Sequence, residues 1–278
     1  MKEYAGKHGH AMGAWTPDSK SHVAHMSDGD FYASEISTTM AQDDHLSIVL
    51  HTQQGSETLA VDISVSAGEI VDAAFMSKAA LCAFYEEQLA STGEGVLFSL
   101  HLKATMMKIS DPIIFGHAVE VYYQEAFDKH RATFDELGIN ANLGLASVLD
   151  KVREQTFSLR NEIEADLRKC HERRPGLAMV DSDKGITNLH VPSDIIVDAS
   201  MPAMIRNSGK MWGPDGRAKD TKAVMPESTY ARIYQEVINF CKTNGAFDPT
   251  TMGSVSNVGL MARKAEEYGS HDKTFEIK

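Results

Sequence analysis

The amino-acid sequence predicts an α/β fold in which helices flank a mixed sheet. Short apolar or β-branched runs alternate along the chain with longer segments of helical periodicity, and this alternation is typical of α/β proteins. The 278 residues, of which 42% are apolar and 24% charged, are enough for a sizeable hydrophobic core. We treat residues 1–278 as a single α/β region, with a sub-boundary near residues 140–175.

The first half of the chain predicts a hairpin, a helix and a buried strand. Residues 45–51 and 57–65 are β-rich runs joined by the sequence QQGS, which indicates an antiparallel hairpin. Residues 95–102 read GVLFSLHL, an almost continuous apolar run that is typical of a strand buried on both faces. Residues 76–90 predict a helix capped by Ser77. The apolar face of that helix consists of Leu81, Phe84, Tyr85 and Leu89.

The second half predicts mainly helices. Asp111 and the proline after it form a strong helix start, with Asp111 as N-cap and a helix that reaches Leu137 and stops at Gly138. Residues 160–172 predict a charged amphipathic helix, and residues 226–242 predict the best helix of the chain. The apolar stripe of that last helix consists of Tyr230, Ile233, Tyr234, Val237, Ile238 and Cys241. Short strands are expected at residues 178–180, 194–197 and 273–278.

Composition and charge exclude several classes of protein. No apolar run approaches the roughly 20 residues that a membrane helix needs, and the N-terminal residues MKEYAGKHGH contain no apolar signal-peptide core. The formal net charge of −12 argues against a nucleic-acid partner, because the phosphates would be repelled. Cys82, Cys170 and Cys241 are widely spaced, which favours a reducing compartment. We therefore expect a soluble, cytoplasmic protein with no membrane partner.

The common motifs for cofactors and nucleophiles are missing from the sequence. It contains no GxGxxG dinucleotide fingerprint, no Walker phosphate loop, no GxSxG nucleophile elbow and no HExxH zinc helix. His22 and His25 have i, i+3 spacing, but without a third ligand nearby a surface or capping role is more common than a metal site. Single polar residues at strand ends are the remaining candidates.

Lys103 and Asp198 each follow an apolar strand-like run directly. A lysine that is desolvated at the edge of a buried sheet has a lowered pKa and can act as a base, although a lysine at a strand end often only extends its ammonium group to solvent. Asp198 has the position of a ligand for Mg²⁺ or Mn²⁺, and equally the position of an N-cap for the helix expected after it.

Tyr268 and a basic stretch are two further candidates. A tyrosine beside a lysine or a metal can donate a proton to an enolate, although a tyrosine in such a place is more often a packing residue. The stretch 206–222 carries a local surplus of three positive charges, which could receive an anion or surround the GPDG turn at 213–216. Its basic residues are Arg206, Lys210, Arg217, Lys219 and Lys222.

Long stretches of the sequence resemble one family of enzymes. HLKATMMKISDPIIFG (101–116), SDKGITNLHVPSDIIVDASMPAMIRNSGKMWGPDG (182–216) and GAFDPTTMGSVSNVGLMARKAEEYGSHDKTF (245–275) resemble the monomeric-type NADP-dependent isocitrate dehydrogenase of bacteria. GAWTPDSKSHVAHM (13–26) fits the same family, so the resemblance covers essentially the whole chain. Members are considerably longer and fold into a small domain made from both chain ends and a large α/β domain. This sequence resembles the first part of that large domain.

The resemblance implies oxidative decarboxylation of isocitrate to 2-oxoglutarate and CO₂, with reduction of NADP in the presence of Mg²⁺ or Mn²⁺. This reaction belongs to the tricarboxylic acid cycle, and the resemblance also implies a connection to the glyoxylate bypass. The family's catalytic lysine falls on Lys103 and its catalytic tyrosine on Tyr268, which would form an acid/base pair. One of its metal-binding aspartates falls on Asp198.

Other functional residues of the family have no counterpart in this sequence. The Ser/Asn/Arg set that binds the isocitrate carboxylates lies before the region matching Met1, and further metal aspartates, a substrate arginine and the glycine-rich NADP segment lie beyond Lys278. We therefore expect a part of a longer enzyme that binds metal weakly, contains no NADP-binding residue and turns over only when the missing segments are supplied.

An alternative from another functional class is a non-catalytic α/β module that keeps the fold and binds a partner. The family is monomeric, but a partial chain could self-associate through surface that the missing segments would cover.

Overall fold

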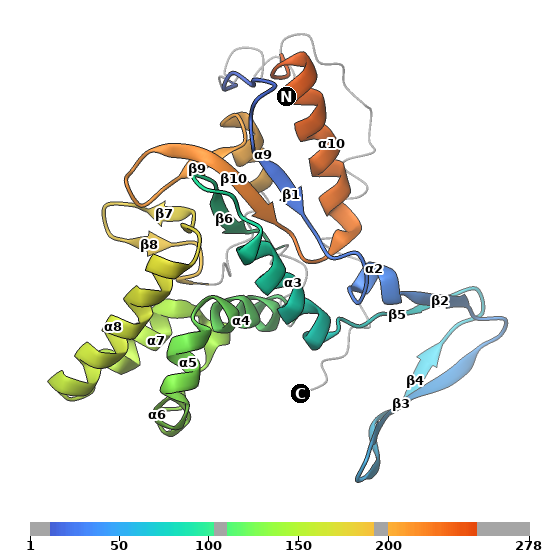
Figure 1. Cartoon of the computed structure of the whole chain (residues 1–278). Helices are drawn as coiled ribbons and strands as arrows, with labels where there is room; N and C mark the ends of the chain where they lie inside the picture. Colours follow the sequence, from blue (N-terminus) through green and yellow to red (C-terminus); the bar gives the residue numbers. More distant parts are fainter. Residues whose placement is uncertain (1–11, 103–109, 192–199, 249–278) are drawn as a thin grey trace, which may run out of the picture.

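The computed structural model describes residues 12–102, 110–191 and 200–248, and a short mixed sheet forms its centre (Figure 1). Within these residues the strands are β1 (His22–Ala24), β2 (Ile36–Thr39), β3 (Asp44–Thr52), β4 (Gly55–Val65), β5 (Ile70–Ala73), β6 (Leu97–Leu100), β7 (Met179–Asp181), β8 (Ile186–Thr187), β9 (Lys210–Trp212) and β10 (Ala218–Val224). The helices are α2 (Phe31–Ser34), α3 (Lys78–Ala90), α4 (Ser110–Tyr122), α5 (Gln124–Lys129), α6 (Arg131–Glu136), η1 (Ala141–Leu143), α7 (Gly144–Arg153), α8 (Phe157–Arg173), α9 (Ser200–Arg206) and α10 (Ser228–Asn244).

The central sheet confirms the predicted mixed α/β fold. Its strands lie in the order β1-β10-β6 and are parallel, while β9 pairs antiparallel with β10. Strand β6 is paired on both edges, because the backbone N–H of Phe98 donates to the carbonyl of Gly176 (2.8 Å) and the N–H of Ala178 donates to the carbonyl of Phe98 (2.9 Å). All four residues of β6 are buried, as the apolar run predicts.

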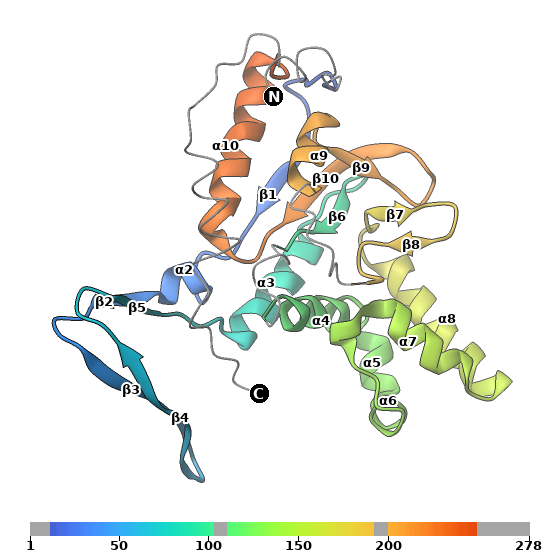
Figure 2. The ribbon, with the colours of Figure 1, turned by 180° about the vertical axis from the view of Figure 1, so that it is seen from behind.

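Two hydrophobic cores support this sheet (Figures 1 and 2). The larger core joins β6 to α3, α4, α5, α7 and α8, and its largest fully buried side chains include Tyr85, Phe98, Tyr122 and Tyr123. The smaller core joins β1 and β10 to α9 and α10 around Trp15, Met204 and Ile238. The sub-boundary near residues 140–175 stays a prediction.

Several sequence predictions are confirmed by the element bounds. The predicted hairpin is β3–β4, which pair antiparallel, and the predicted helix 76–90 is α3. Its N-cap is Ser77, whose hydroxyl accepts a hydrogen bond from the Ala80 N–H at 3.3 Å. The four apolar residues predicted for its inner face are all buried. The helix at 160–172 is part of α8, and the strand at 178–180 is β7, shifted by one residue.

The predicted helix from Asp111 to Leu137 is wrong in its continuity. It is three helices, α4, α5 and α6, broken at Tyr123 and His130, whose φ angles are −103° and −105°. Both breaks coincide with bonds to α8, because the Tyr123 hydroxyl meets His171 (3.0 Å) and the His130 ring meets Asp166 (2.9 Å). Tertiary contacts thus override local helix propensity here. The predicted stop is correct, since Gly138 has φ +57°.

Two smaller predictions also need correction. Asp111 is not an N-cap, because it lies inside the first turn of α4. On α10 the predicted stripe is partly wrong: Ile238 and Cys241 are buried, but Ile233 is 61% exposed. Ala231 takes its place in the core. The predicted strands at 194–197 and 273–278 lie outside the described residues, as does the side chain of Tyr230.

Neither disulfides nor membrane spans shape the described part of the chain. Cys82, Cys170 and Cys241 carry free thiols. No helix within residues 12–102, 110–191 and 200–248 is both long enough and apolar enough to cross a bilayer.

A buried lysine joins the central sheet to α3 through hydrogen bonds. Lys222 of β10 is 2% exposed, and its ammonium group donates to the carbonyl of Gln88 (3.0 Å), the side-chain oxygen of Gln88 (3.3 Å) and the hydroxyl of Ser91 (2.9 Å). These acceptors lie at the C-terminal end of α3, where the helix dipole favours a cation. Burial lowers the pKa of Lys222, so the three hydrogen bonds are what keep the charged form in place.

We predict that Lys222→Met lowers the free energy of unfolding by about 1–3 kcal/mol, because it removes the buried donor to the Gln88 carbonyl, the Gln88 side chain and the Ser91 hydroxyl. Urea denaturation followed by far-ultraviolet circular dichroism measures this change. The exposed Lys20 is the matched control, and Lys20→Met should change stability by less than about 0.5 kcal/mol. Equal effects of the two substitutions would contradict a capping role for Lys222.

Candidate active site

A polar network lies at the carboxyl end of β6, the end at which α/β proteins commonly bind ligands. The Asn188 side-chain amide donates to the hydroxyl of Ser99 (2.9 Å) and to the carbonyl of Leu100 (3.2 Å). The Ser99 hydroxyl lies 2.9 Å from His101 Nε2, and His101 Nδ1 lies 3.1 Å from the hydroxyl of Ser200. We call Ser99, His101, Asn188 and Ser200 the β6 network.

The imidazole of His101 is neutral in this setting. Its side chain is buried, and burial lowers its pKa to about 4. A neutral imidazole has one donor and one acceptor nitrogen, so it can link a serine hydroxyl on each side. The β6 network therefore ties three separate chain segments together without placing a charge in the core.

The three site residues predicted from the sequence, Lys103, Asp198 and Tyr268, lie outside the described residues. Two of them have close described neighbours. His101 precedes Lys103 by two positions and Ser200 follows Asp198 by two positions, and these neighbours are hydrogen-bonded to each other.

Sequence reasoning missed the β6 network itself. A signal was present, because Ser99 and His101 are polar residues inside the otherwise apolar run GVLFSLHL. Buried polar groups in such a run require partners from elsewhere in the chain.

A buried carboxyl group follows closely in the chain. Asp111 in α4 is 6% exposed, and its Oδ2 atom has no hydrogen-bond partner among the described residues. Burial raises its pKa to about 7, and the negative charge of Glu227 adds to the effect.

The basic stretch at 206–222 does not act as one cluster. Lys222 is buried against the end of α3, whereas Lys219 pairs with Asp215 at 3.0 Å beside the turn of the β9–β10 hairpin. The sequence left two alternatives, an anion site or a basic surface around the 213–216 turn, and the second describes Lys219 better.

A cavity of about 330 Å³ lies at the opposite, amino end of β6, between residues 89–96 and 173–176. It contains two arginines, but each already pairs with a carboxylate. Arg174 donates to Glu86 at 2.7 Å, and Arg173 donates to Glu125. The cavity therefore offers no unpaired arginine to an anionic ligand.

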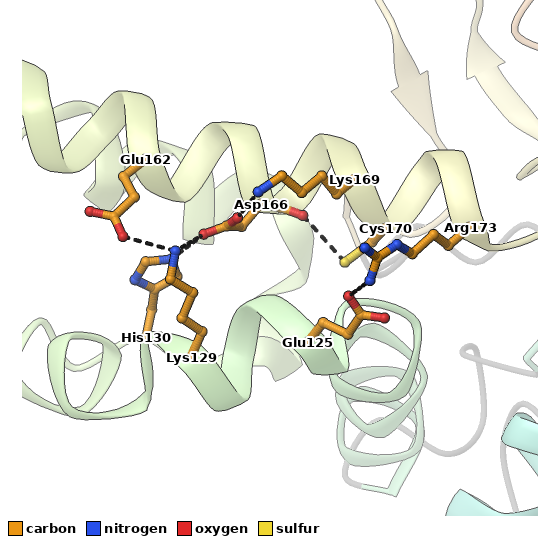
Figure 3. Close-up of polar contacts among 8 residues, drawn as sticks. All are labelled: Glu125, Lys129, His130, Glu162, Asp166, Lys169, Cys170 and Arg173. Carbon is orange, nitrogen blue, oxygen red and sulfur yellow. Dashed lines mark hydrogen bonds and ion pairs between the residues drawn. The ribbon is translucent and has the colours of Figure 1, made fainter.

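Three metal-ligating side chains converge between α5 and α8 (Figure 3). They are His130, Glu162 and Asp166, whose ligand atoms lie within 4.8 Å of one another. Lysine ammonium groups already satisfy the carboxylates: Lys129 lies 2.9 Å from Glu162 and 2.7 Å from Asp166, and Lys169 lies 2.7 Å from the other oxygen of Asp166. This donor set does not suit Mg²⁺ or Mn²⁺, which need free carboxylate oxygens.

The group is better described as a network of ion pairs that joins the two helices. Hydrogen bonds from Lys129 and Lys169 hold the pKa of Asp166 well below its usual range, and His130 contributes a further bond. A carboxylate with a depressed pKa stabilises the folded state above the ordinary aspartate pKa of about 4, and this contribution is lost as pH falls below that value.

We predict that Asp166→Asn lowers the free energy of unfolding by about 1–2 kcal/mol at pH 7, a modest value because both ammonium groups remain half exposed. Asp150, which pairs with Arg153 at 2.9 Å on an exposed surface, is the matched control, and Asp150→Asn should cost less than about 0.5 kcal/mol. Denaturant melts between pH 3 and 7 test this. The difference between wild type and Asp166→Asn should shrink toward pH 3, and a difference that stays constant would contradict the assignment.

Comparison with known proteins identifies relatives along the full chain. The chain is 60% identical over 279 residues to NADP isocitrate dehydrogenase 2 of Mycobacterium tuberculosis, a match that covers 100% of this chain and 37% of that protein. It is 61% identical over 278 residues to NADP isocitrate dehydrogenase 2 of Psychrobacter sp. (strain 13A), covering 99% of this chain and 38% of the relative. It is 57% identical over 279 residues to the NADP isocitrate dehydrogenase of Azotobacter vinelandii, with 100% and 38% covered.

The chain thus spans less than two fifths of the length of each of these relatives. The family model of monomeric isocitrate dehydrogenase matches residues 1–278. Because that match extends over every residue of the sequence, this chain belongs to the monomeric isocitrate dehydrogenase family.

Proposed function

We propose that the longer protein represented by this chain converts isocitrate to 2-oxoglutarate and CO₂ in the cytoplasm while reducing NADP. Family membership and the names of the relatives support this proposal. The activity is assigned to a full-length form, because this chain spans 37–38% of those relatives.

The observation that carries the proposal is the 3.1 Å hydrogen bond between His101 and Ser200. These residues lie two positions from Lys103 and Asp198, respectively. Consecutive Cα atoms are about 3.8 Å apart, so Lys103 and Asp198 are each separated by at most about 8 Å of chain from a member of this hydrogen bond, which supports the proposal that both serve one site. The family roles of these two residues require such proximity.

In the proposed reaction Lys103 accepts the proton of the isocitrate hydroxyl, and Tyr268 returns a proton to the enol after CO₂ leaves. A lysine can accept a proton near neutral pH only if its pKa is lowered, as happens in a desolvated place. Strand β6, which ends three residues before Lys103, is buried throughout.

Asp198 would provide one carboxylate ligand for Mg²⁺ or Mn²⁺ in this scheme. A bound divalent cation supplies positive charge beside the substrate oxygen that carries the reacting proton. One carboxylate is too few for tight binding, so further ligands are expected from the remainder of a full-length protein. The groups that bind NADP are expected there as well.

We predict that Lys103→Met, placed in a full-length form, lowers kcat by about 100- to 10,000-fold without changing the fold, because it removes the proton acceptor. NADPH formation from isocitrate and Mn²⁺ measures the rate, and circular dichroism checks the fold. The exposed Lys78 of α3 supplies the control, and Lys78→Met should retain nearly full turnover. Near-normal turnover of Lys103→Met would remove the base assignment.

We predict that Asp198→Asn, in the same full-length form, weakens Mn²⁺ binding at least about tenfold, because a neutral amide replaces an anionic ligand. Direct calorimetric titration with Mn²⁺ reports this without relying on activity. Asp183→Asn, at an exposed aspartate upstream, should leave the titration unchanged. An unaltered Mn²⁺ affinity for Asp198→Asn would reduce Asp198 to a helix cap.

A further inference from the structure

His101 is held by three hydrogen bonds directly after strand β6. Its backbone N–H donates to the carbonyl of Val224 (2.8 Å), which continues the parallel pairing of β6 with β10 by one residue. Its side chain is buried, and its two ring nitrogens lie 2.9 Å from the Ser99 hydroxyl and 3.1 Å from the Ser200 hydroxyl. The ring cannot turn without losing both side-chain bonds, so its Nδ1 atom is a fixed point at this end of the sheet.

The partners of the ring determine which way each hydrogen bond points. The Asn188 amide nitrogen donates to the Leu100 carbonyl (3.2 Å) and to the Ser99 hydroxyl (2.9 Å). The Ser99 hydroxyl then donates its own proton to an unprotonated Nε2 atom of His101. That tautomer leaves the ring proton on Nδ1, which donates it to the Ser200 oxygen. The β6 network is thus one directed chain of hydrogen bonds from Asn188 to Ser200.

The chain before residues 192–199 is attached to α7. The backbone N–H groups of Leu145 and Ala146, in the first turn of α7, donate to the carbonyls of residues 189 and 190 (3.0 and 2.9 Å). Gly144 permits this close approach, because its φ is +83° and a Cβ atom there would lie 2.2 Å from the His190 carbonyl oxygen. The described chain is therefore held in place up to residue 190.

The chain after residues 192–199 is held in two ways. Helix α9 places Met201, Met204 and Ile205 in the smaller core, and the Ser200 hydroxyl bonds to His101. Ser200 itself is exposed, and a hydrogen bond to an exposed hydroxyl contributes little to stability, because water can replace it. The bond to His101 therefore matters less for folding than for where the start of α9 lies relative to the end of β6.

We propose that His101 is a positioning residue of the active site. Its bond to Ser200 holds the chain that follows Asp198 against the chain that precedes Lys103, so that the metal ligand and the proton acceptor meet the same substrate. This inference rests on the proposed function, because it requires Lys103 and Asp198 to serve one site. Loss of the bond slows turnover and weakens metal binding without unfolding the protein.

The first test removes the Ser200 hydroxyl in a full-length form. Ser200→Ala should lower kcat about 10- to 100-fold and weaken Mn²⁺ binding by a similar factor, as is typical when a group that orients metal ligands is lost. NADPH formation from isocitrate gives kcat, and calorimetric titration gives the Mn²⁺ affinity without relying on activity. The KM for NADP should stay unchanged, because its binding groups are expected elsewhere in the full-length protein. Unchanged kcat and Mn²⁺ affinity would overturn the proposal.

Two companion variants separate positioning from a structural role. Ser200→Thr keeps a hydroxyl at this position and should retain at least about half of the wild-type kcat. Ser34→Ala removes a hydroxyl that accepts from the Phe75 N–H (2.9 Å) and donates to the Phe75 carbonyl (2.6 Å), and should leave kcat and Mn²⁺ affinity unchanged. Urea denaturation gives the folded fraction of each variant. Equal losses in Ser200→Thr and Ser200→Ala, or a loss of turnover that only follows the folded fraction, would overturn the positioning role.

A double variant tests the bond itself. His101→Phe and Ser200→Ala remove opposite ends of one bond, so the double variant should be no slower than His101→Phe alone. Losses that multiply would mean that the two side chains act independently, which would overturn the proposal.

Failure of this proposal is distinguishable from failure of the proposed function. If Lys103→Met stops turnover while Ser200→Ala leaves turnover and Mn²⁺ affinity normal, the positioning role falls and the proposed function stands. If Lys103→Met retains near-normal turnover, the proposed base falls, and the role of His101 falls with it.

Discussion

The pairing of β6 on both of its edges is the constraint on which the rest of the structure depends. One edge bonds to β10 in parallel register, and the other bonds to the backbone of residues 176–178. Both faces of the strand are buried as well, and none of its four residues is more than 8% exposed. Helices α3, α4 and α8 must therefore complete the larger core around it, and Lys222 of β10 joins the end of α3 to the same sheet.

Burial of β6 also determines what happens at its carboxyl end. A buried polar group needs partners, and Ser99 and His101, which bond to each other, still need further ones. These further partners are Asn188 and Ser200, which lie 89 and 99 positions away in the sequence. The need for hydrogen bonds in a dry environment thus brings distant segments to one point. A catalytic group at this end of β6 would therefore be held by hydrogen bonds between distant segments.

Local patterns made much of the fold predictable. The double burial of β6 and the Ser77 cap follow from side-chain sequence alone. The predictions that were wrong depend on contacts between residues that are far apart in the sequence. The breaks at Tyr123 and His130 arise from bonds to α8, and no local signal in 111–137 announces them. Ile233 fits the helical period of α10 but faces solvent, because the core contacts a neighbouring stripe instead.

The candidate site was predictable only through family resemblance. Apolar runs before Lys103 and Asp198 left each residue with two competing interpretations, because periodicity describes a strand end without saying what lies opposite it. The His101–Ser200 contact is the kind of long-range information that one sequence does not contain. Resemblance contributed the roles of these residues, and the fold adds a physical reason for two of the segments to meet.

The body of the protein and the β2–β5 segment, residues 36–73, differ in how their charges are satisfied. In the body Lys222 has three acceptors, the Asp166 carboxylate has lysine partners, and the buried His101 stays neutral. Each requirement is met inside the body. Residues 36–73 contain six acidic residues and neither lysine nor arginine, and the side chains of Ile36, Val61 and Ile70 are largely exposed. The charge and apolar surface of these residues therefore face water to a greater extent than those of the body.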